Sequence, residues 1–124
     1  MQPECDVNRI SQLSSEELHK LPYGVIQLDT EGNVVFYSDY ESRLSRLPRE
    51  RVVGKNFFTE IAPCTDVKEF RGQFLEGVAK RELHVRFHFH FPFKVNPQTV
   101  LVTLFYSSIT ENVWVLVQPT EGDT

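Results

Sequence analysis

The sequence predicts an α+β fold: a five-stranded antiparallel sheet with its helices inserted between the second and the third strand. Two observations lead to this prediction. Segments typical of strands occur on both sides of the middle of the chain, two before residue 40 and three from residue 82 onward, whereas the middle has the breaks and the spacing of short helices. The chain has 124 residues with 40% hydrophobic content, enough to bury one core and too few for two domains of ordinary size. We therefore expect one domain.

The N-terminal segment "VNRISQLSSEELHKL" is predicted to form one or two short helices. Ser14 and Glu17 have the spacing of a capping box, and the apolar residues follow a loosely helical period. Pro22 and Gly24 then end the helical pattern.

A hairpin and a crossing segment follow. "GVIQLD" and "VVFYS" are typical of strands, at about residues 24–29 and 33–38, and the connection "TEGN" between them suits a tight turn. From residue 40 to about residue 55 the helical pattern is broken by Pro48 and Gly54. This part of the chain is therefore predicted to form small helices and turns instead of one rod.

The last helix is predicted over about residues 66–80, with Gly77 near its end. Its apolar residues recur at the spacing of one helical face, which indicates an amphipathic helix packed on the sheet. The apolar positions are Phe70, Phe74, Leu75 and Val78.

The C-terminal part is predicted to form three strands. In "ELHVRFHFHFPF" apolar and polar residues alternate, so the two kinds of side chain are expected on opposite faces of the sheet. The apolar face would carry Val85, Phe87, Phe89, Phe91 and Phe93, and the polar face His84, Arg86, His88 and His90. "QTVLVTLFYSSI" and "NVWVLVQ" complete an antiparallel hairpin across "ITEN".

Composition and charge argue against several classes of partner. The net charge is −4 and no basic stripe is visible, so nucleic acid is not expected as a partner. The N-terminus lacks the basic start and the apolar segment of a signal peptide, and no stretch approaches the roughly 18 apolar residues of a membrane span. We therefore expect a cytoplasmic protein without membrane contact, in which Cys5 and Cys64 stay reduced and free.

Three histidines of the polar face raise the question of a metal site, since residues two apart on a strand point the same way. They are His84, His88 and His90. Because they alternate with phenylalanines that face the core, a solvated outer face explains them more simply. No metal is expected.

Cys64 lies in "IAPCTD", just before the predicted helix of residues 66–80. At the head of a helix, amide groups and the positive end of the dipole would stabilise a thiolate, or a carbonyl group attached to the sulfur. The position therefore favours covalent attachment chemistry. A buried, inert thiol is the alternative, and a catalytic nucleophile is disfavoured because no sequence signature supplies a base beside it.

Glu41 lies four residues after Tyr37 and four before Ser45, so that one helical face could bring a phenol, a carboxyl and a hydroxyl together. The local sequence also allows a plain alternative, in which Glu41 is a solvent-facing carboxylate on a short helix.

From Gly24 to the C-terminus the chain resembles the photoactive yellow protein family, the prototype of the PAS fold. The resemblance rests on "GVIQLDTEGNVVFY", "VVGKNFFTEIAPCTD", "EFRGQFLEGVA" and "VWVLV". It implies a PAS domain over residues 24–118, preceded by an N-terminal helical cap (1–23) and followed by a C-terminal tail (119–124).

The resemblance also implies a covalent pigment. In this family the cysteine of "APCTD" carries 4-hydroxycinnamate (p-coumaric acid) as a thioester, and it corresponds to Cys64. The tyrosine and the glutamate that hydrogen-bond the pigment phenolate correspond to Tyr37 and Glu41, and Ser45 replaces a supporting threonine. The implied pocket is further lined by Leu47, Phe57, Ala62, Pro63, Thr65 and Phe91.

The function implied is that of a blue-light photoreceptor and not of an enzyme. Trans–cis isomerisation and proton transfer from Glu41 would start the signal, and the N-terminal helical segment would be the part that moves. The resemblance leaves the downstream partner open, and the chain is expected to be a monomer or a weak dimer.

Besides Ser45, three positions depart from the family pattern. Leu47 stands where the family has an arginine that covers the pocket, Phe93 replaces a tyrosine, and Val95 replaces a methionine. Leu47 favours an alternative function, a PAS interaction or ligand-sensing module that has lost the pigment. A cysteine-dependent acyl-transfer enzyme is a further alternative, which the lack of an identifiable base disfavours.

Overall fold

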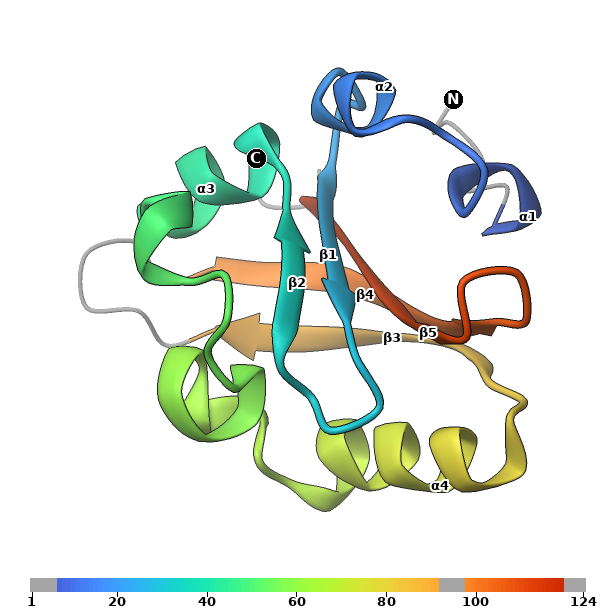
Figure 1. Cartoon of the computed structure of the whole chain (residues 1–124). Helices are drawn as coiled ribbons and strands as arrows, with labels where there is room; N and C mark the ends of the chain where they lie inside the picture. Colours follow the sequence, from blue (N-terminus) through green and yellow to red (C-terminus); the bar gives the residue numbers. More distant parts are fainter. Residues whose placement is uncertain (1–6, 92–97, 120–124) are drawn as a thin grey trace.

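Five strands form one antiparallel sheet in the computed structural model, which describes residues 7–91 and 98–119. The strands lie in the order β2-β1-β5-β4-β3, so the first and the last strands of the chain are neighbours in the middle of the sheet (Figure 1). Their bounds are β1 Gly24–Leu28, β2 Val34–Tyr37, β3 His84–Phe91, β4 Gln98–Ser107 and β5 Asn112–Pro119. The predicted α+β fold, with its helices inserted after the second strand, is confirmed.

Two short helices precede the sheet, and a series of short helices and single turns connects β2 to β3. The N-terminal helices are α1 Val7–Ile10 and α2 Ser15–His19. The connection contains α3 Asp39–Ser45, η1 Arg49–Arg51, η2 Phe57–Ile61, η3 Pro63–Thr65, η4 Lys68–Gly72 and α4 Gln73–Lys80, where η marks a short turn of 3₁₀ or π helix.

The capping box predicted before α2 is present. The amide of Glu17 donates to the Ser14 hydroxyl at 3.2 Å, and the amide of Ser14 donates to the Glu17 carboxylate at 2.9 Å. These two bonds satisfy amides that have no partner inside the helix, which is why so short a helix begins here.

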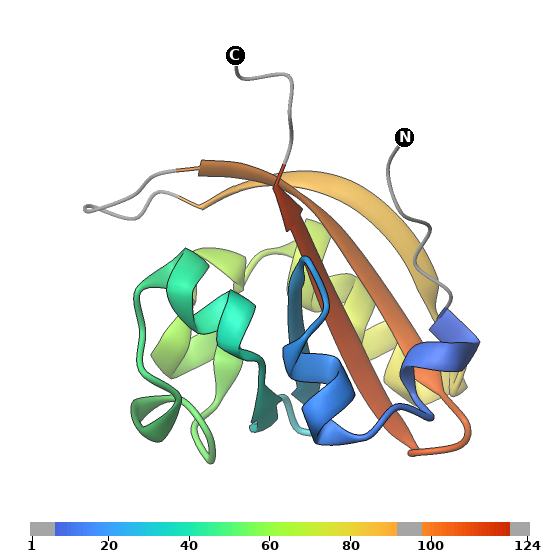
Figure 2. The ribbon, with the colours of Figure 1, turned by 90° about the horizontal axis from the view of Figure 1, so that it is seen from above.

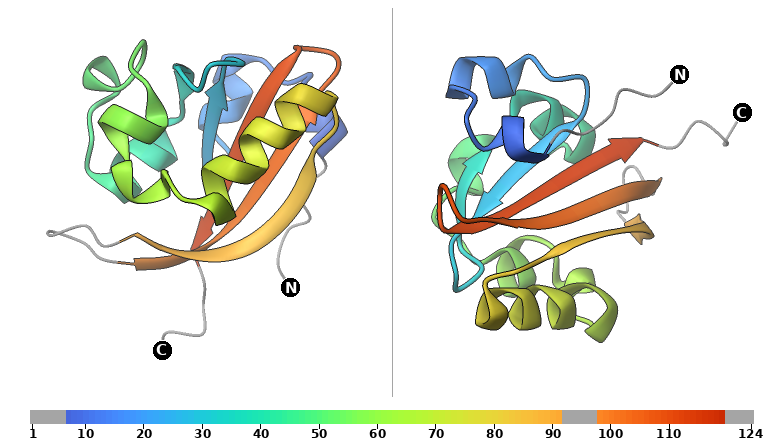
Figure 3. Two further views of the ribbon diagram at one scale, coloured as in Figure 1. Left: turned by 90° about the horizontal axis from the view of Figure 1, so that it is seen from below. Right: turned by 90° about the vertical axis from the view of Figure 1, so that its right-hand side faces the viewer.

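Apolar side chains pack on both faces of the sheet, and α1 and α2 lie on the face opposite to α4 (Figure 2, Figure 3). We call the larger cluster, on the side of α4, the main core and the smaller one, beneath α1 and α2, the cap cluster. The main core contains Ile26, Leu28, Val34, Tyr37, Val52, Phe57, Phe58, Ala62, Phe70, Phe74, Phe91, Val100, Val102, Leu104, Val113, Val115 and Val117. The cap cluster contains Ile10, Leu18, Tyr23, Val25, Phe105, Trp114 and Leu116.

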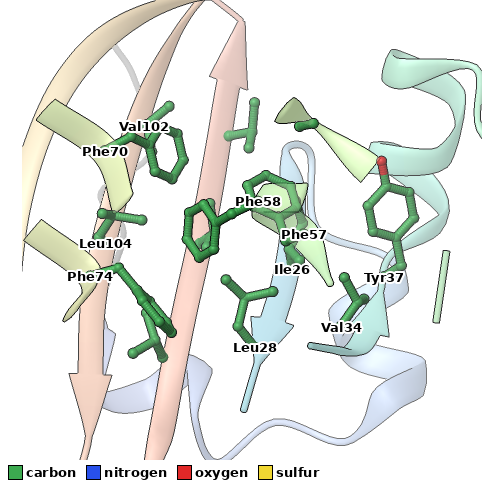
Figure 4. Packing of buried hydrophobic residues seen from close by; sticks show 14 of the residues in the cluster. Ile26, Leu28, Val34, Tyr37, Phe57, Phe58, Phe70, Phe74, Val102 and Leu104 are labelled. Atoms are coloured by element: carbon green, nitrogen blue, oxygen red, sulfur yellow. The ribbon is translucent and has the colours of Figure 1, made fainter. Parts of the chain in front are cut away.

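The prediction of one helix over residues 66–80 is partly wrong. The α-helix begins only at Gln73, and the residues before it form the π turn η4. Phe70 and Phe74 are almost fully buried in the main core (Figure 4), but the side chain of Leu75 is 52% exposed. Leu75 follows Phe74 directly and is rotated from it by about 100° around the helix, which places it on the solvent side.

The alternation predicted for β3 is confirmed for the described residues, because the phenylalanines point toward the main core and the histidines are exposed. Phe93 and Val95 lie outside the described residues. Within residues 7–91 and 98–119 no cluster of three or more histidine, cysteine or acidic side chains could hold a metal ion. Over the same ranges, each helix is too short or too polar to cross a membrane.

Candidate functional site

A buried phenol and a buried hydroxyl meet at the end of β2. Tyr37 is the last residue of this strand and Ser45 the last residue of α3, and their oxygens lie 2.7 Å apart, within hydrogen-bonding distance. Figure 4 shows the Tyr37 ring at the edge of the main core, with its oxygen pointing away from β2. Of the three groups expected to meet, the phenol of Tyr37 and the hydroxyl of Ser45 therefore lie together.

Ser38 fixes the position of α3 on the sheet. Its hydroxyl accepts hydrogen bonds from the amides of Glu41 at 3.2 Å and Val25 at 3.0 Å, and its own amide donates to the carbonyl of Val25 at 2.9 Å. Ser38 is fully buried and acts as the capping residue of α3. We did not identify it from the sequence, although a serine three residues before a glutamate is the signal of such a cap.

Glu41 is buried on α3, with 6% of its surface exposed. Burial raises the pKa of its carboxyl from 4.5 to about 8, so the group is mostly protonated at neutral pH. Its Oε1 atom is buried and has no hydrogen-bond partner within the described part of the chain. The alternative of a solvent-facing carboxylate is therefore wrong. Burial, and to a smaller extent the Glu41 carboxyl, also raises the pKa of the Tyr37 phenol, which therefore stays protonated.

Gly24 leaves the space that the Glu41 carboxyl occupies. A β-carbon at Gly24 would overlap Oε1 of Glu41, and it would lie 3.1 Å from the Cβ of Glu41, which is a tight contact. From the sequence we interpreted Gly24 only as the end of the helical segment. The role of Gly24 depends on a contact with a residue of another element, and no local sequence pattern indicates such a contact.

Cys64 lies in the middle of η3 and not at the head of an α-helix. It is partly buried, and it packs against the main core as a free cysteine. Burial raises the pKa of its thiol, only partly offset by a backbone hydrogen bond. The expectation that a helix terminus stabilises its thiolate is therefore wrong. Cys5 lies outside the described residues.

Thr65 holds the turn around Cys64, and Asn56 holds the start of the preceding turn η2. The hydroxyl of Thr65, which is fully buried, donates to the carbonyl of Ala62 at 2.7 Å. The side-chain oxygen of Asn56 accepts hydrogen bonds from the amides of Phe58 and Thr59 at 3.1 and 3.2 Å, and its amide group donates to the carbonyl of Glu31 at 2.9 Å. The bond from Asn56 to Glu31 connects the start of η2 to the hairpin between β1 and β2. We did not identify Asn56 from the sequence.

The other residues expected in the pocket divide between core and surface. Phe57, Ala62 and Phe91 belong to the main core, and Leu47 packs partly buried against it. Pro63 is exposed. The expected residues thus come from β2, α3, η2, η3 and β3 and from the connections that hold Leu47 and Ala62. Of these residues, Tyr37, Leu47, Phe57, Ala62, Cys64 and Phe91 lie in or against the main core.

Comparison with known proteins gives three concordant results. The family profile described as the PAS fold matches residues 13–117. The chain is 35% identical over 111 residues to the photoactive yellow protein of Halochromatium salexigens, and 35% identical over 111 residues to that of Rhodothalassium salexigens; each match covers 90% of this chain and 89% of the relative. Among solved structures, the photoactive yellow protein domain of the sensor histidine kinase Ppr from Rhodospirillum centenum superposes with a TM-score of 0.82 at 39% identity, covering 88% of this chain and 96% of that domain.

Proposed function

Because the chain belongs to the PAS-fold family and, within it, to the photoactive yellow protein family, we propose that it is a blue-light photoreceptor that carries p-coumarate as a thioester on Cys64. When bound, this pigment supplies the absorption of visible light and a double bond that light converts from trans to cis. The residues of the chain hold the pigment and handle its proton.

The unpaired oxygen of Glu41 is the observation that carries the proposal. A buried polar atom without a partner costs free energy, about 1–3 kcal/mol in proteins, and it is uncommon in a folded core. A protonated carboxyl is a hydrogen-bond donor, and a buried phenolate needs donors. Glu41 and Tyr37 are two such donors next to the main core, so they fit the phenolate end of the pigment, while Cys64 fits its acyl end.

Glu41 can also release its proton. Its pKa of about 8 lies close to neutral pH, so the free-energy difference between its protonated and ionised forms is small there. Once ionised it would be a buried charge, and Gly24, against which its Oε1 lies, offers no side chain to pair with it. Such a charge destabilises its surroundings. We propose that this destabilisation starts the conformational change that carries the signal.

Acylation of Cys64 by activated p-coumarate tests the proposal. In the reaction the sulfur forms a bond to the acyl carbon of p-coumaric anhydride, the bond from that carbon to the departing carboxylate breaks, and the thiol proton passes to solvent. The protein should gain an absorption band in the visible and one pigment mass on Cys64. Cys64→Ser should gain neither, and Cys5→Ser, as the matched control, should gain both. A wild-type protein that acquires no visible band, or a Cys64→Ser variant that does, would contradict the proposal.

A second candidate function is a PAS ligand-sensing or interaction module without the pigment. Leu47 favours it, because this position packs an apolar side chain against the main core where the family has an arginine. Mass spectrometry of the protein from its native host separates the two functions, since only the photoreceptor carries a p-coumaroyl group on Cys64. Acyl-transfer catalysis by Cys64 stays disfavoured, because no sequence signature supplies a base beside the thiol.

We also propose that the protein acts in the cytoplasm, where the thiol of Cys64 remains reduced and can be acylated.

A further inference from the structure

We infer that His19 is a positioning residue, which ties the N-terminal helical cap (α1 and α2) to the start of α3, and that uptake of a proton by its imidazole ring opens this connection. The inference goes beyond light reception and applies to the protein without pigment. Its residues come from three separate parts of the chain.

Both ring nitrogens of His19 contact residues of the chain segment between β2 and β3. The amide of Asp39 donates to Nδ1 at 3.0 Å, and Nη1 of Arg49 lies 2.8 Å from Nε2. The ring also packs on Phe36 of β2, with centroids 5.0 Å apart. Asp39 is the first residue of α3, and its amide has no partner inside the helix. An imidazole from α2 thus satisfies an amide of α3.

Only the neutral imidazole ring of His19 can accept a hydrogen bond from these neighbours. The amide of Asp39 and the guanidinium of Arg49 are both donors, and a guanidinium cannot accept. A neutral imidazole has one accepting nitrogen, so it accepts from one of these two groups; a protonated imidazole accepts from neither. Proton uptake would therefore remove the hydrogen bond and place two positive charges 2.8 Å apart.

One group opposes this effect. The carboxylate of Asp39 lies 3.5 Å from Nδ1 of His19 and would attract a protonated ring. This carboxylate is half exposed, and it already pairs with Arg49 at 3.2 Å. An ion pair between exposed groups contributes little to stability. Within the described residues the charged groups that face the ring are thus Asp39 from α3 and Arg49 from η1, while β2 contributes the uncharged ring of Phe36.

Opening of this connection affects two parts of the molecule. It leaves α2 anchored to the sheet chiefly by Leu18 in the cap cluster, and it uncovers the first amide of α3, the helix that carries Glu41. The cap cluster also contains Trp114, which is 2% exposed and is the single tryptophan of the chain. Its fluorescence therefore reports whether the N-terminal helical cap stays in place.

The experiment compares the full-length protein without pigment at about pH 7 and about pH 5, a range in which histidine ordinarily changes its charge. Hydrogen exchange of residues 7–21 is measured by mass spectrometry and expressed as protection factors, together with the emission of Trp114. We expect protection to fall about tenfold at the lower pH, which corresponds to about 1.4 kcal/mol, and the emission to move to longer wavelength. Because no pigment is used, a negative result leaves the proposed light reception untouched.

Three variants decide whether His19 causes the pH dependence of the two readouts. In His19→Gln both readouts should become independent of pH, whereas the matched control His88→Gln, an exposed histidine on β3, should behave as the wild type does. In Arg49→Gln the opposing positive charge is absent, so the midpoint of the change should move to higher pH. The inference is overturned if the wild type shows no change, if His19→Gln keeps it, if His88→Gln loses it, or if the midpoint in Arg49→Gln stays where it was.

Discussion

Replacing Glu41 by glutamine should change how the stability of the pigment-free protein depends on pH. The pKa of Glu41 is raised by burial from 4.5 to about 8, so the folded protein holds this proton more tightly than the unfolded chain does. The protonated carboxyl therefore favours the folded state fully below pH 4.5. This contribution is lost as the pH rises through about 8, and above that value it no longer changes.

The size of the effect follows from the same two values. Between them the free energy of unfolding should fall by about 1.4 kcal/mol for each pH unit, which amounts to about 5 kcal/mol over the whole range. Small domains have unfolding free energies of about 5–15 kcal/mol. A loss of this size is therefore easy to measure, and it would dominate the behaviour of the protein in mildly alkaline solution.

Urea denaturation at a series of pH values provides the assay. Other groups also titrate, so the informative quantity is the difference in unfolding free energy between the wild type and Glu41→Gln, plotted against pH. This difference should slope downward from about pH 5 to about pH 8. Glu50→Gln, at an exposed position of η1, is the matched control, and its difference from the wild type should stay flat. A flat line for Glu41→Gln as well would refute the claim that the fold holds a neutral buried acid.

Three further substitutions test hydrogen bonds and contacts of the candidate site by urea denaturation. Gly24→Ala should cost about 1–3 kcal/mol because its β-carbon overlaps the Glu41 carboxyl, and it should cost less in a Glu41→Ala background, where the carboxyl is gone. Tyr37→Phe should cost about 1–3 kcal/mol because it leaves the buried hydroxyl of Ser45 unpaired, and the double variant with Ser45→Ala should cost less than the sum of the single changes. Asn56→Ala should cost about 1–2 kcal/mol because two amides of η2 lose their acceptor. The contact between Gly24 and Glu41 would be contradicted if Gly24→Ala cost the same in both backgrounds. The hydrogen bond between Tyr37 and Ser45 would be contradicted if their costs were strictly additive, and the cap at Asn56 if Asn56→Ala were as stable as the wild type.

Features set by local periodicity could be predicted from the sequence. The alternation in β3 and the capping box before α2 depend on residues two or three apart, and both are present in the structure. The exposure of Leu75 could not be predicted from this spacing. The spacing shows which residues recur on one side of a helix, but the width of the face that packs on the sheet depends on the tertiary fold, and in α4 that face includes Phe74 and not Leu75.

The candidate site could be predicted only where the resemblance supplied it. The local sequence alone favours a solvent-facing Glu41, whereas the fold buries this residue and places its carboxyl against Gly24 of β1. His19 offers a clearer case, because its two partners lie 20 and 30 residues further along the chain. Contacts over such separations are made by the tertiary fold, and no window of sequence contains both sides of them.

The start of α3 is the point at which the site and the N-terminal helical cap act on each other. Ser38 binds the amides of both Glu41 and Val25, and Val25 packs in the cap cluster on the opposite face of the sheet. The next residue, Asp39, gives its amide to His19 of the cap. A charge that forms on Glu41 and a proton that binds to His19 would thus disturb the same turn of helix from its two sides. The start of α3 would therefore couple the proposed light reception to the proposed opening at His19, because each event changes the hydrogen bonds or the charge at this turn.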